Sequence, residues 1–179
     1  MFDPTAFDNM KVVIEGAFYD MDLSGEVLIT DRNDWINIAK MSRLFTISFQ
    51  LPGASQAKIT AKMELESTLE NLAAELLPGI QSEPLTGCYV KLKYFLNHKN
   101  DLDLFEKIER LLTETWGNTR KISQSAEYNP LLRSDIIKNV VTIDFLRLVS
   151  EDQLEDLVEM TGIMRTTIQK LDDLIFNTH

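Results

Sequence analysis

Hydrophobic and polar residues alternate in four stretches of this chain, at 43–51, 57–65, 88–96 and 139–149. Successive side chains of a β-strand point to opposite faces, so this pattern predicts strands with at least one buried face. Less regular patterns predict further strands at 11–19, 26–30 and, more weakly, 120–128.

Three stretches with helical spacing of their apolar residues follow strands. Each begins behind a residue that can cap a helix: Ser67, Asn100 and Ser150. Ser67 with Glu70, and Ser150 with Gln153, have the spacing of capping boxes. Stop signals follow the first two helices, at Pro78-Gly79 and at Gly117.

The order of these elements predicts the α+β class, because strands come first, strands alternate with helices next, and the C-terminus is helical. We expect a small antiparallel β-barrel or a strongly bent sheet, with packed helices. Residues 1–119 are predicted to form a β-rich domain. Residues 120–179 are predicted to form a strand plus a helical region, as a second unit or as part of the same domain.

The charge of the chain narrows the classes of partner. Its 179 residues include 28 acidic and 18 basic side chains, for a net charge of −10. This acidity disfavours nucleic acid and anionic lipid as partners. The excess acid is concentrated in residues 1–34 and 151–179. We therefore expect protein partners, with basic surfaces.

Cysteine usage and the N-terminal sequence favour the cytoplasm. The single cysteine, Cys88, cannot form an internal disulfide. Residues 1–4 have neither the basic region nor the apolar stretch of a signal peptide. No apolar run approaches the length of a membrane span, about 20 residues. We expect a cytoplasmic protein that does not enter a membrane.

Residues with the chemistry of catalysis are few. The chain contains no P-loop, no dinucleotide-binding glycine motif and no zinc-protease motif. Cys88 and His98 are the available nucleophile–base pair, and the alternation around Cys88 predicts a buried thiol instead. We expect a protein that is not an enzyme and binds no cofactor.

Residues 11–115 contain a series of features that resembles a PilZ domain. An early predicted strand precedes Asp22-Leu23-Ser24-Gly25, a later one ends in Leu51-Pro52, and a strand behind Gly87 leads into a helix. The resemblance implies a small β-barrel and places Asp22 and Ser24 in the family's ligand-binding turn. The alternative is an unrelated β-rich domain.

The resemblance also bears on function. PilZ domains bind cyclic di-GMP with an R-x-x-x-R arm, whose guanidinium groups hold phosphates and stack on guanine. No two arginines of this chain are four positions apart. The resemblance therefore implies a degenerate PilZ-like domain that acts through protein–protein contacts, as a regulatory or adaptor protein.

Residues 20–31 also fit the spacing of a calcium-binding loop, with a glycine at the sixth position and an aliphatic residue at the eighth. A calcium-binding protein is thus an alternative. The opposing interpretation is an acidic turn, because the last position holds an aspartate instead of the usual glutamate. The candidate oxygen ligands are Asp20, Asp22, Ser24, Glu26 and Asp31.

Residues 154–172 resemble the helix-turn-helix of transcription regulators, with Gly162 at the turn. A DNA-binding regulator is therefore a further alternative, although the acidic charge of this region opposes it. The residues that would contact DNA are Arg165, Thr166, Thr167, Gln169 and Lys170.

The same segment has a second interpretation as a helical hairpin or one long helix. Its apolar stripe has near-heptad spacing, which is typical of a core helix and of a helix that pairs with a second subunit. Core packing or a homo-oligomer through the C-terminal helices is favoured over DNA binding. The stripe consists of Leu157, Met164, Ile168, Leu171 and Ile175.

Overall fold

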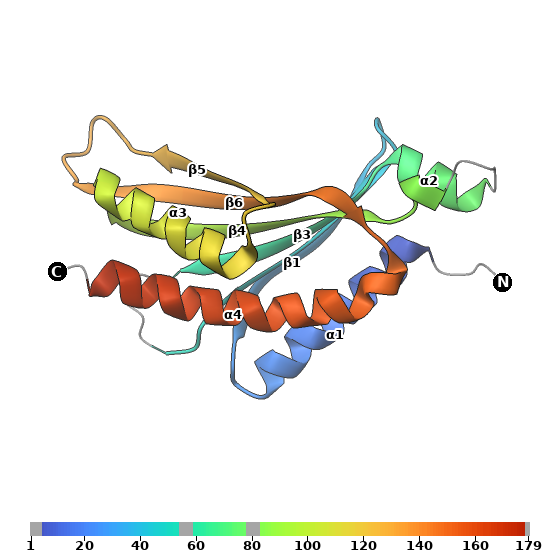
Figure 1. The fold of residues 1–179 in the computed structure, drawn as a ribbon, viewed down its shortest axis with the longest axis horizontal. Helices are drawn as coiled ribbons and strands as arrows, with labels where there is room; N and C mark the ends of the chain where they lie inside the picture. The colour runs from blue at the N-terminus through green and yellow to red at the C-terminus, as the bar shows by residue number, and fades with distance from the viewer. Residues whose placement is uncertain (1–4, 54–58, 78–82, 178–179) are drawn as a thin grey trace.

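The protein consists of one antiparallel sheet of six strands and four α-helices (Figure 1). The computed structural model describes residues 5–53, 59–77 and 83–177. The strands are β1 (Leu28–Asn37), β2 (Ser42–Gln50), β3 (Thr60–Ser67), β4 (Cys88–Lys99), β5 (Lys121–Glu127) and β6 (Ile136–Val149). The helices are α1 (Ala6–Leu23), α2 (Leu69–Leu76), α3 (Leu102–Trp116) and α4 (Leu154–Phe176), with 3₁₀ turns at Glu83–Leu85 and Glu151–Gln153.

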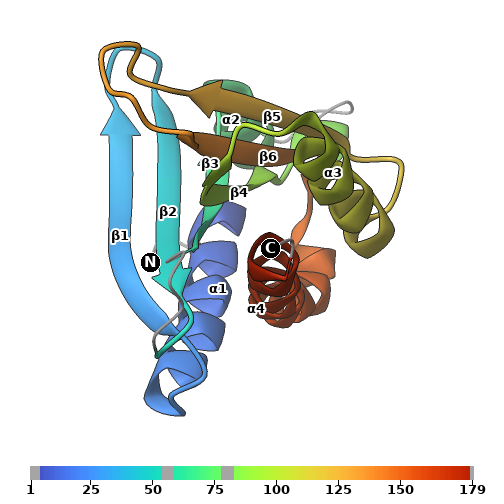
Figure 2. The ribbon, with the colours of Figure 1, turned by 90° about the vertical axis from the view of Figure 1, so that its left-hand side faces the viewer.

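The sheet is open, with the strand order β1-β2-β3-β4-β6-β5. Within the described residues β1 pairs with β2 alone and β5 with β6 alone, so the two edges do not meet. Figure 2 shows β1 and β2 running across the direction of β5 and β6, with α1 and α4 inside the angle between them. The α+β class is confirmed, and the closed barrel that the PilZ resemblance implied is wrong. The helices fill the space that a closed barrel would enclose.

The predicted strand at 11–19 is wrong, because these residues belong to α1. Thr5 caps this helix: its hydroxyl accepts a hydrogen bond from the backbone N–H of Asp8, and the carboxylate of Asp8 accepts one from the backbone N–H of Thr5. Met10, Ile14 and Phe18 are fully buried at the i, i+4 spacing of a helix. Alternation within the nine-residue window concealed this longer period.

The remaining predicted strands are present in the structure. The four alternating stretches correspond to β2, β3, β4 and β6, although residues 57 and 58, at the start of the second, lie outside the described residues. The weak pattern at 120–128 corresponds to β5. The pattern at 26–30 marks only the start of β1, because the rest of this edge strand is largely exposed.

The predicted caps are correct at one helix and shifted by one residue at two others. Ser150 and Gln153 form the predicted capping box before α4. Thr68, with Asn71, caps α2 in place of Ser67, and Asp101 caps α3 in place of Asn100. Gly117 ends α3 with a φ of +90°. The predicted stop at Pro78-Gly79 lies outside the described residues.

One hydrophobic core lies between the sheet and the helices α1, α3 and α4. The core includes Phe45 and Met63 from the predicted region 1–119, and Ile143 and Met164 from the predicted region 120–179. Strand β6 pairs directly with β4, so residues 120–179 extend the same sheet. No helix in the described part of the chain is long and apolar enough to cross a membrane.

Candidate functional site

The helix-turn-helix interpretation of residues 154–172 is wrong, because α4 is one continuous helix through Gly162. Thr167 is fully buried, and its hydroxyl donates to the backbone carbonyl of Ile163 at 2.7 Å. Arg165 forms an ion pair with Glu26, with Nη1 and Oε2 3.2 Å apart. The proposed DNA-contacting residues therefore do not form one solvent-facing row, although Thr166, Gln169 and Lys170 are exposed.

The reason is the apolar stripe. All five of its residues are buried in the core, where α4 packs against α1 and α3. A turn at Gly162 would divide this stripe, whereas a straight helix buries both halves at once. The surface on which a homo-oligomer through the C-terminal helices was predicted is therefore occupied within the chain.

Replacing Gly162 with alanine is expected to raise the free energy of unfolding by about 0.5–1 kcal/mol. A Cβ at this position meets no atom within 4 Å, and alanine reduces the conformational entropy of the unfolded chain. Urea denaturation measures the change. In a helix-turn-helix the same substitution would force an L-residue into a left-handed turn, so a loss of stability would contradict the continuous helix.

The predicted calcium loop is a helix end followed by a turn and a strand. Asp22 accepts a hydrogen bond from the backbone N–H of Ile29 at 3.0 Å, and Ser24 caps α1 and donates to the carbonyl of Met21 at 3.1 Å. The acidic candidates lie on different elements: Asp20 and Asp22 in α1, Glu26 in the turn and Asp31 in β1.

These side chains do not converge on a point. No group of three or more acidic, histidine or cysteine side chains within the described residues is placed to hold a metal ion, so the structure does not support the calcium-loop prediction. Asp22 and Ser24, which the PilZ resemblance placed in a ligand-binding turn, stabilise the connection between α1 and β1. The positive φ of Gly25, +77°, belongs to the same turn.

Cys88 and His98 do not form a catalytic pair. They stand at opposite ends of the core face of β4, ten positions or about 33 Å apart at the rise of a β-strand. Burial raises the pKa of the Cys88 thiol to about 12. Burial also lowers the pKa of His98, whose Nδ1 lies 2.7 Å from the carbonyl of Lys99 and whose Nε2 lies 3.0 Å from Nδ2 of Asn139. Both groups are parts of the core.

The β1–β2 hairpin carries four exposed large apolar side chains at and beside its turn, with Trp35 and Ile36 on opposite faces of β1, and we call them the hairpin patch. Its members are 60%, 67%, 81% and 55% exposed: Trp35, Ile36, Ile38 and Met41. Large apolar groups that stay in water at the tip of an edge hairpin do not stabilise the fold. Exposed groups of this kind are typical of surfaces that bind another molecule.

The hairpin is held to α1 close to its turn. Arg43 on β2 bonds to Asp8 of α1 at 2.8 Å and to Asp34 of β1 at 3.0 Å, and its guanidinium lies 4.3 Å from the ring centroid of Phe7. Partial burial of Asp34 favours its neutral form, but hydrogen bonds from Lys11 and Arg43 outweigh this effect and keep the pKa of Asp34 below its ordinary value. These contacts therefore fix the hairpin next to the patch.

The turn of the hairpin is also defined. The side-chain oxygen of Asn37 accepts a hydrogen bond from the backbone N–H of Lys40 at 3.1 Å. Met41 has a φ of +52°, a conformation that costs free energy for a residue other than glycine. The hairpin patch therefore has a set arrangement at the end of β1.

Sequence reasoning did not find the hairpin patch. A signal was available in the segment Asn33-Asp34-Trp35-Ile36-Asn37-Ile38, where two adjacent apolar residues interrupt the alternation expected of a half-buried strand. Such a pair has to place one of its members on each face of the strand. It could not be interpreted before the edge position of β1 was known.

No family model, no curated protein and no solved structure matches this chain.

Proposed function

We propose that this protein is a non-catalytic regulatory or adaptor protein of the cytoplasm, which acts by binding another protein through its β1–β2 hairpin. The hairpin patch is the observation that supports the proposal. Trp and Met are enriched in the centres of protein interfaces, where a few such side chains supply most of the binding free energy. The contacts that fix the hairpin to α1 beside the patch reduce the entropy that binding costs.

The position of β1 favours the addition of a strand from the partner. Within the described residues, β1 is hydrogen-bonded to β2 alone, which leaves the backbone groups of its outer edge available. An extended peptide segment can pair with such an edge and use alternate side chains for specificity. Trp35 pairs with Leu44, and its side chain therefore lies on the face of the sheet opposite to Phe45 and the helices.

The charge of this edge favours a basic partner segment. Residues 1–34 hold eight acidic and two basic side chains. Of these, Asp31 is an exposed residue on β1 itself, whereas the acid Glu15 is compensated by an ion pair with Arg32. An extended segment with a lysine or arginine four positions from an apolar residue, on the same face of its strand, would match both Asp31 and Trp35.

The PilZ resemblance implied an adaptor function because the chain lacks the arginine arm with which PilZ domains bind cyclic di-GMP. The hairpin patch supports the same function without requiring a closed barrel or a nucleotide. DNA binding and calcium binding have no comparable support, since α4 is one continuous helix with Thr167 buried and Arg165 paired, and the acidic calcium candidates lie on different elements.

The double substitution Trp35→Ser with Ile38→Ser is expected to reduce partner capture at least tenfold, because each truncation of a central interface side chain costs about 1–2 kcal/mol or more. Capture is measured by quantitative mass spectrometry on extracts of the source cells, with the tagged full chain as bait. Both residues are exposed, so the thermal midpoint of the free protein should hardly change.

The matched control is Leu131→Ser with Leu132→Ser, which removes two exposed apolar side chains from the β5–β6 connection. We expect this variant to keep the partner. Equal capture by the wild type and the hairpin variant, or a loss confined to the control, would contradict the proposal.

A further inference from the structure

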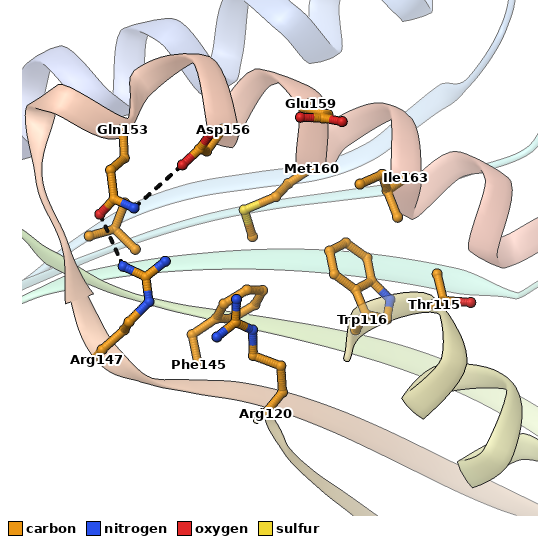
Figure 3. Close-up of a pocket in the computed structure, with 11 residues that line it drawn as sticks. Thr115, Trp116, Arg120, Phe145, Arg147, Gln153, Asp156, Glu159, Met160 and Ile163 are labelled. Carbon is orange, nitrogen blue, oxygen red and sulfur yellow. Dashed lines mark hydrogen bonds between the residues drawn. The ribbon is translucent and has the colours of Figure 1, made fainter. Parts of the chain in front are cut away.

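A pocket lies between the end of α3, the second half of β6 and the first half of α4 (Figure 3). It encloses a volume of about 250 Å³. Drug-sized ligands occupy cavities of about 300–1,000 Å³, so this pocket suits a smaller molecule. It is separate from the hairpin patch, with which it shares no residue.

Two arginines on the sheet side of the pocket lack an anionic partner among the described residues. Arg120 and Arg147 are 27 positions apart in the sequence, and the fold brings both to the pocket. Neither forms an ion pair with a carboxylate of the described residues. In a chain with a net charge of −10, two uncompensated guanidinium groups in one pocket are unexpected.

Neutral groups hold the two guanidinium groups in place. That of Arg120 lies 4.5 Å from the ring centroid of Phe145, and its hydrogen bond, to the hydroxyl of Thr119, is long at 3.4 Å. Nε of Arg120 is buried and has no acceptor in the part of the chain that the structure describes. Arg147 donates from Nη1 to the side-chain oxygen of Gln153 at 3.1 Å. Most of the donors of this pair therefore remain available to a carboxylate, which arginine binds well.

The opposite side of the pocket is acidic. Asp156 and Glu159 come from α4, across the pocket from the arginines (Figure 3). Neither forms an ion pair within the described residues. Asp156 accepts one hydrogen bond, from Nε2 of Gln153 at 3.4 Å. Their oxygens can accept hydrogen bonds from an ammonium group.

The surface between the two charged sides is apolar. Trp116 and Phe145 are nearly buried and meet edge to face, with their ring centroids 6.1 Å apart. Met160 lies between the two charged sides in Figure 3, and Ile163 follows it along α4. A ligand in this pocket therefore meets cations on one side, anions on the other and apolar side chains between.

We propose that this pocket binds a free α-amino acid with an apolar side chain. The ligand carboxylate accepts hydrogen bonds from Arg120 and Arg147. Its ammonium group donates to Asp156 and Glu159, and its side chain packs against Trp116, Phe145 and Met160. The proposal does not depend on the hairpin patch and adds a small-molecule ligand to a protein-binding function.

Titration calorimetry and thermal unfolding of the full chain test this proposal with L-leucine and L-methionine as probes. We expect binding at millimolar concentration and a rise in the thermal midpoint. Two analogues each lack one charge: 4-methylpentanoate has no ammonium group and 3-methylbutylamine has no carboxylate. Both are expected to bind at least tenfold more weakly, because each leaves one charged side of the pocket unpaired.

Variants locate the site. Arg147→Met and Glu159→Gln change exposed side chains, so both proteins should fold, and each is expected to weaken L-leucine binding about tenfold or more. Arg133→Met removes an exposed arginine outside the pocket and should leave the affinity unchanged. The proposal would be overturned if neither amino acid binds, or if both pocket variants bind L-leucine as tightly as the wild type does. If 4-methylpentanoate binds as tightly as L-leucine, the pocket is a simple anion site and the amino-acid proposal is wrong.

Discussion

Replacing Gly87 with alanine is expected to lower the free energy of unfolding by about 3–5 kcal/mol. Gly87 precedes β4 and has a φ of +128°, which L side chains rarely adopt. A Cβ at this position would stand 2.3 Å from the carbonyl oxygen of Val149 and 3.0 Å from its carbonyl carbon. These are backbone atoms of β6, so the clash cannot be relieved by rotating a side chain.

The expected loss joins two costs. A strained backbone conformation costs about 1–3 kcal/mol, and a steric overlap in a packed region costs a similar amount. Cys88 pairs with Val149, so any shift that makes room for the new methyl group also disturbs the β4–β6 ladder. Urea denaturation measures the change in the free energy of unfolding.

Gly117→Ala is the control that separates these costs. Gly117 also has a positive φ, +90°, but a Cβ there meets nothing within 4 Å. We expect a loss of about 1–3 kcal/mol, from the backbone conformation alone. If both substitutions cost the same, the close approach of Gly87 to β6 contributes nothing, and the described contact is wrong.

The second large effect is expected at Leu171, a member of the apolar stripe of α4 that is fully buried. Leu171→Ala removes most of this side chain from the core and leaves a cavity, which costs about 2–5 kcal/mol. For a chain of this size the thermal midpoint falls by about 2–4 °C for each kcal/mol. Thermal and urea unfolding provide the measurement.

The neighbouring substitution Lys170→Ala is the control, because Lys170 is exposed on the same helix. Its effect is expected to stay within about 0.5 kcal/mol. Unfolding is also measured over a range of protein concentrations. A midpoint that rises with protein concentration in the wild type and loses this dependence in Leu171→Ala would show that the stripe joins two subunits, and it would contradict core packing.

A structural feature of this protein could be predicted from the sequence where its signal is local. Strands β2, β3, β4 and β6 were predictable because each has one face against the core and one face without a covering helix, which imposes a period of two on adjacent residues. The capping box of Ser150 and Gln153 was predictable because its hydrogen bonds join residues three positions apart. Both signals lie within one short segment.

Helix α1 shows where a local pattern fails. Residues 11–19 alternate well enough for a strand, but their buried positions, Ile14 and Phe18, continue the spacing of Met10 and Phe7 outside that window. The choice between the two periods was made by the cap at Thr5 and by packing against α4. Gly162 shows the same limit, since a glycine at a predicted turn is also compatible with an uninterrupted helix.

The candidate sites were less predictable than the fold. Arg120 and Arg147 belong to different elements, and no pattern in the sequence relates them. Trp35 and Ile38 become a candidate interface only because β1 is an edge strand. By contrast, the calcium spacing at 20–31 was present in the sequence, and the boundary between α1 and β1 separates its carboxylates.

The sequence alone therefore determined the α+β class, most of the strands, the acidic ends and the buried character of Cys88. These properties follow from the periodicity and composition of neighbouring residues. The tertiary structure decided that the sheet stays open and that α4 is a continuous core helix. It also decided that the hairpin patch exists, and that one pocket has arginines on one side and carboxylates on the other. Each of these depends on which distant segments come into contact, and that depends on the free energy of packing the whole chain.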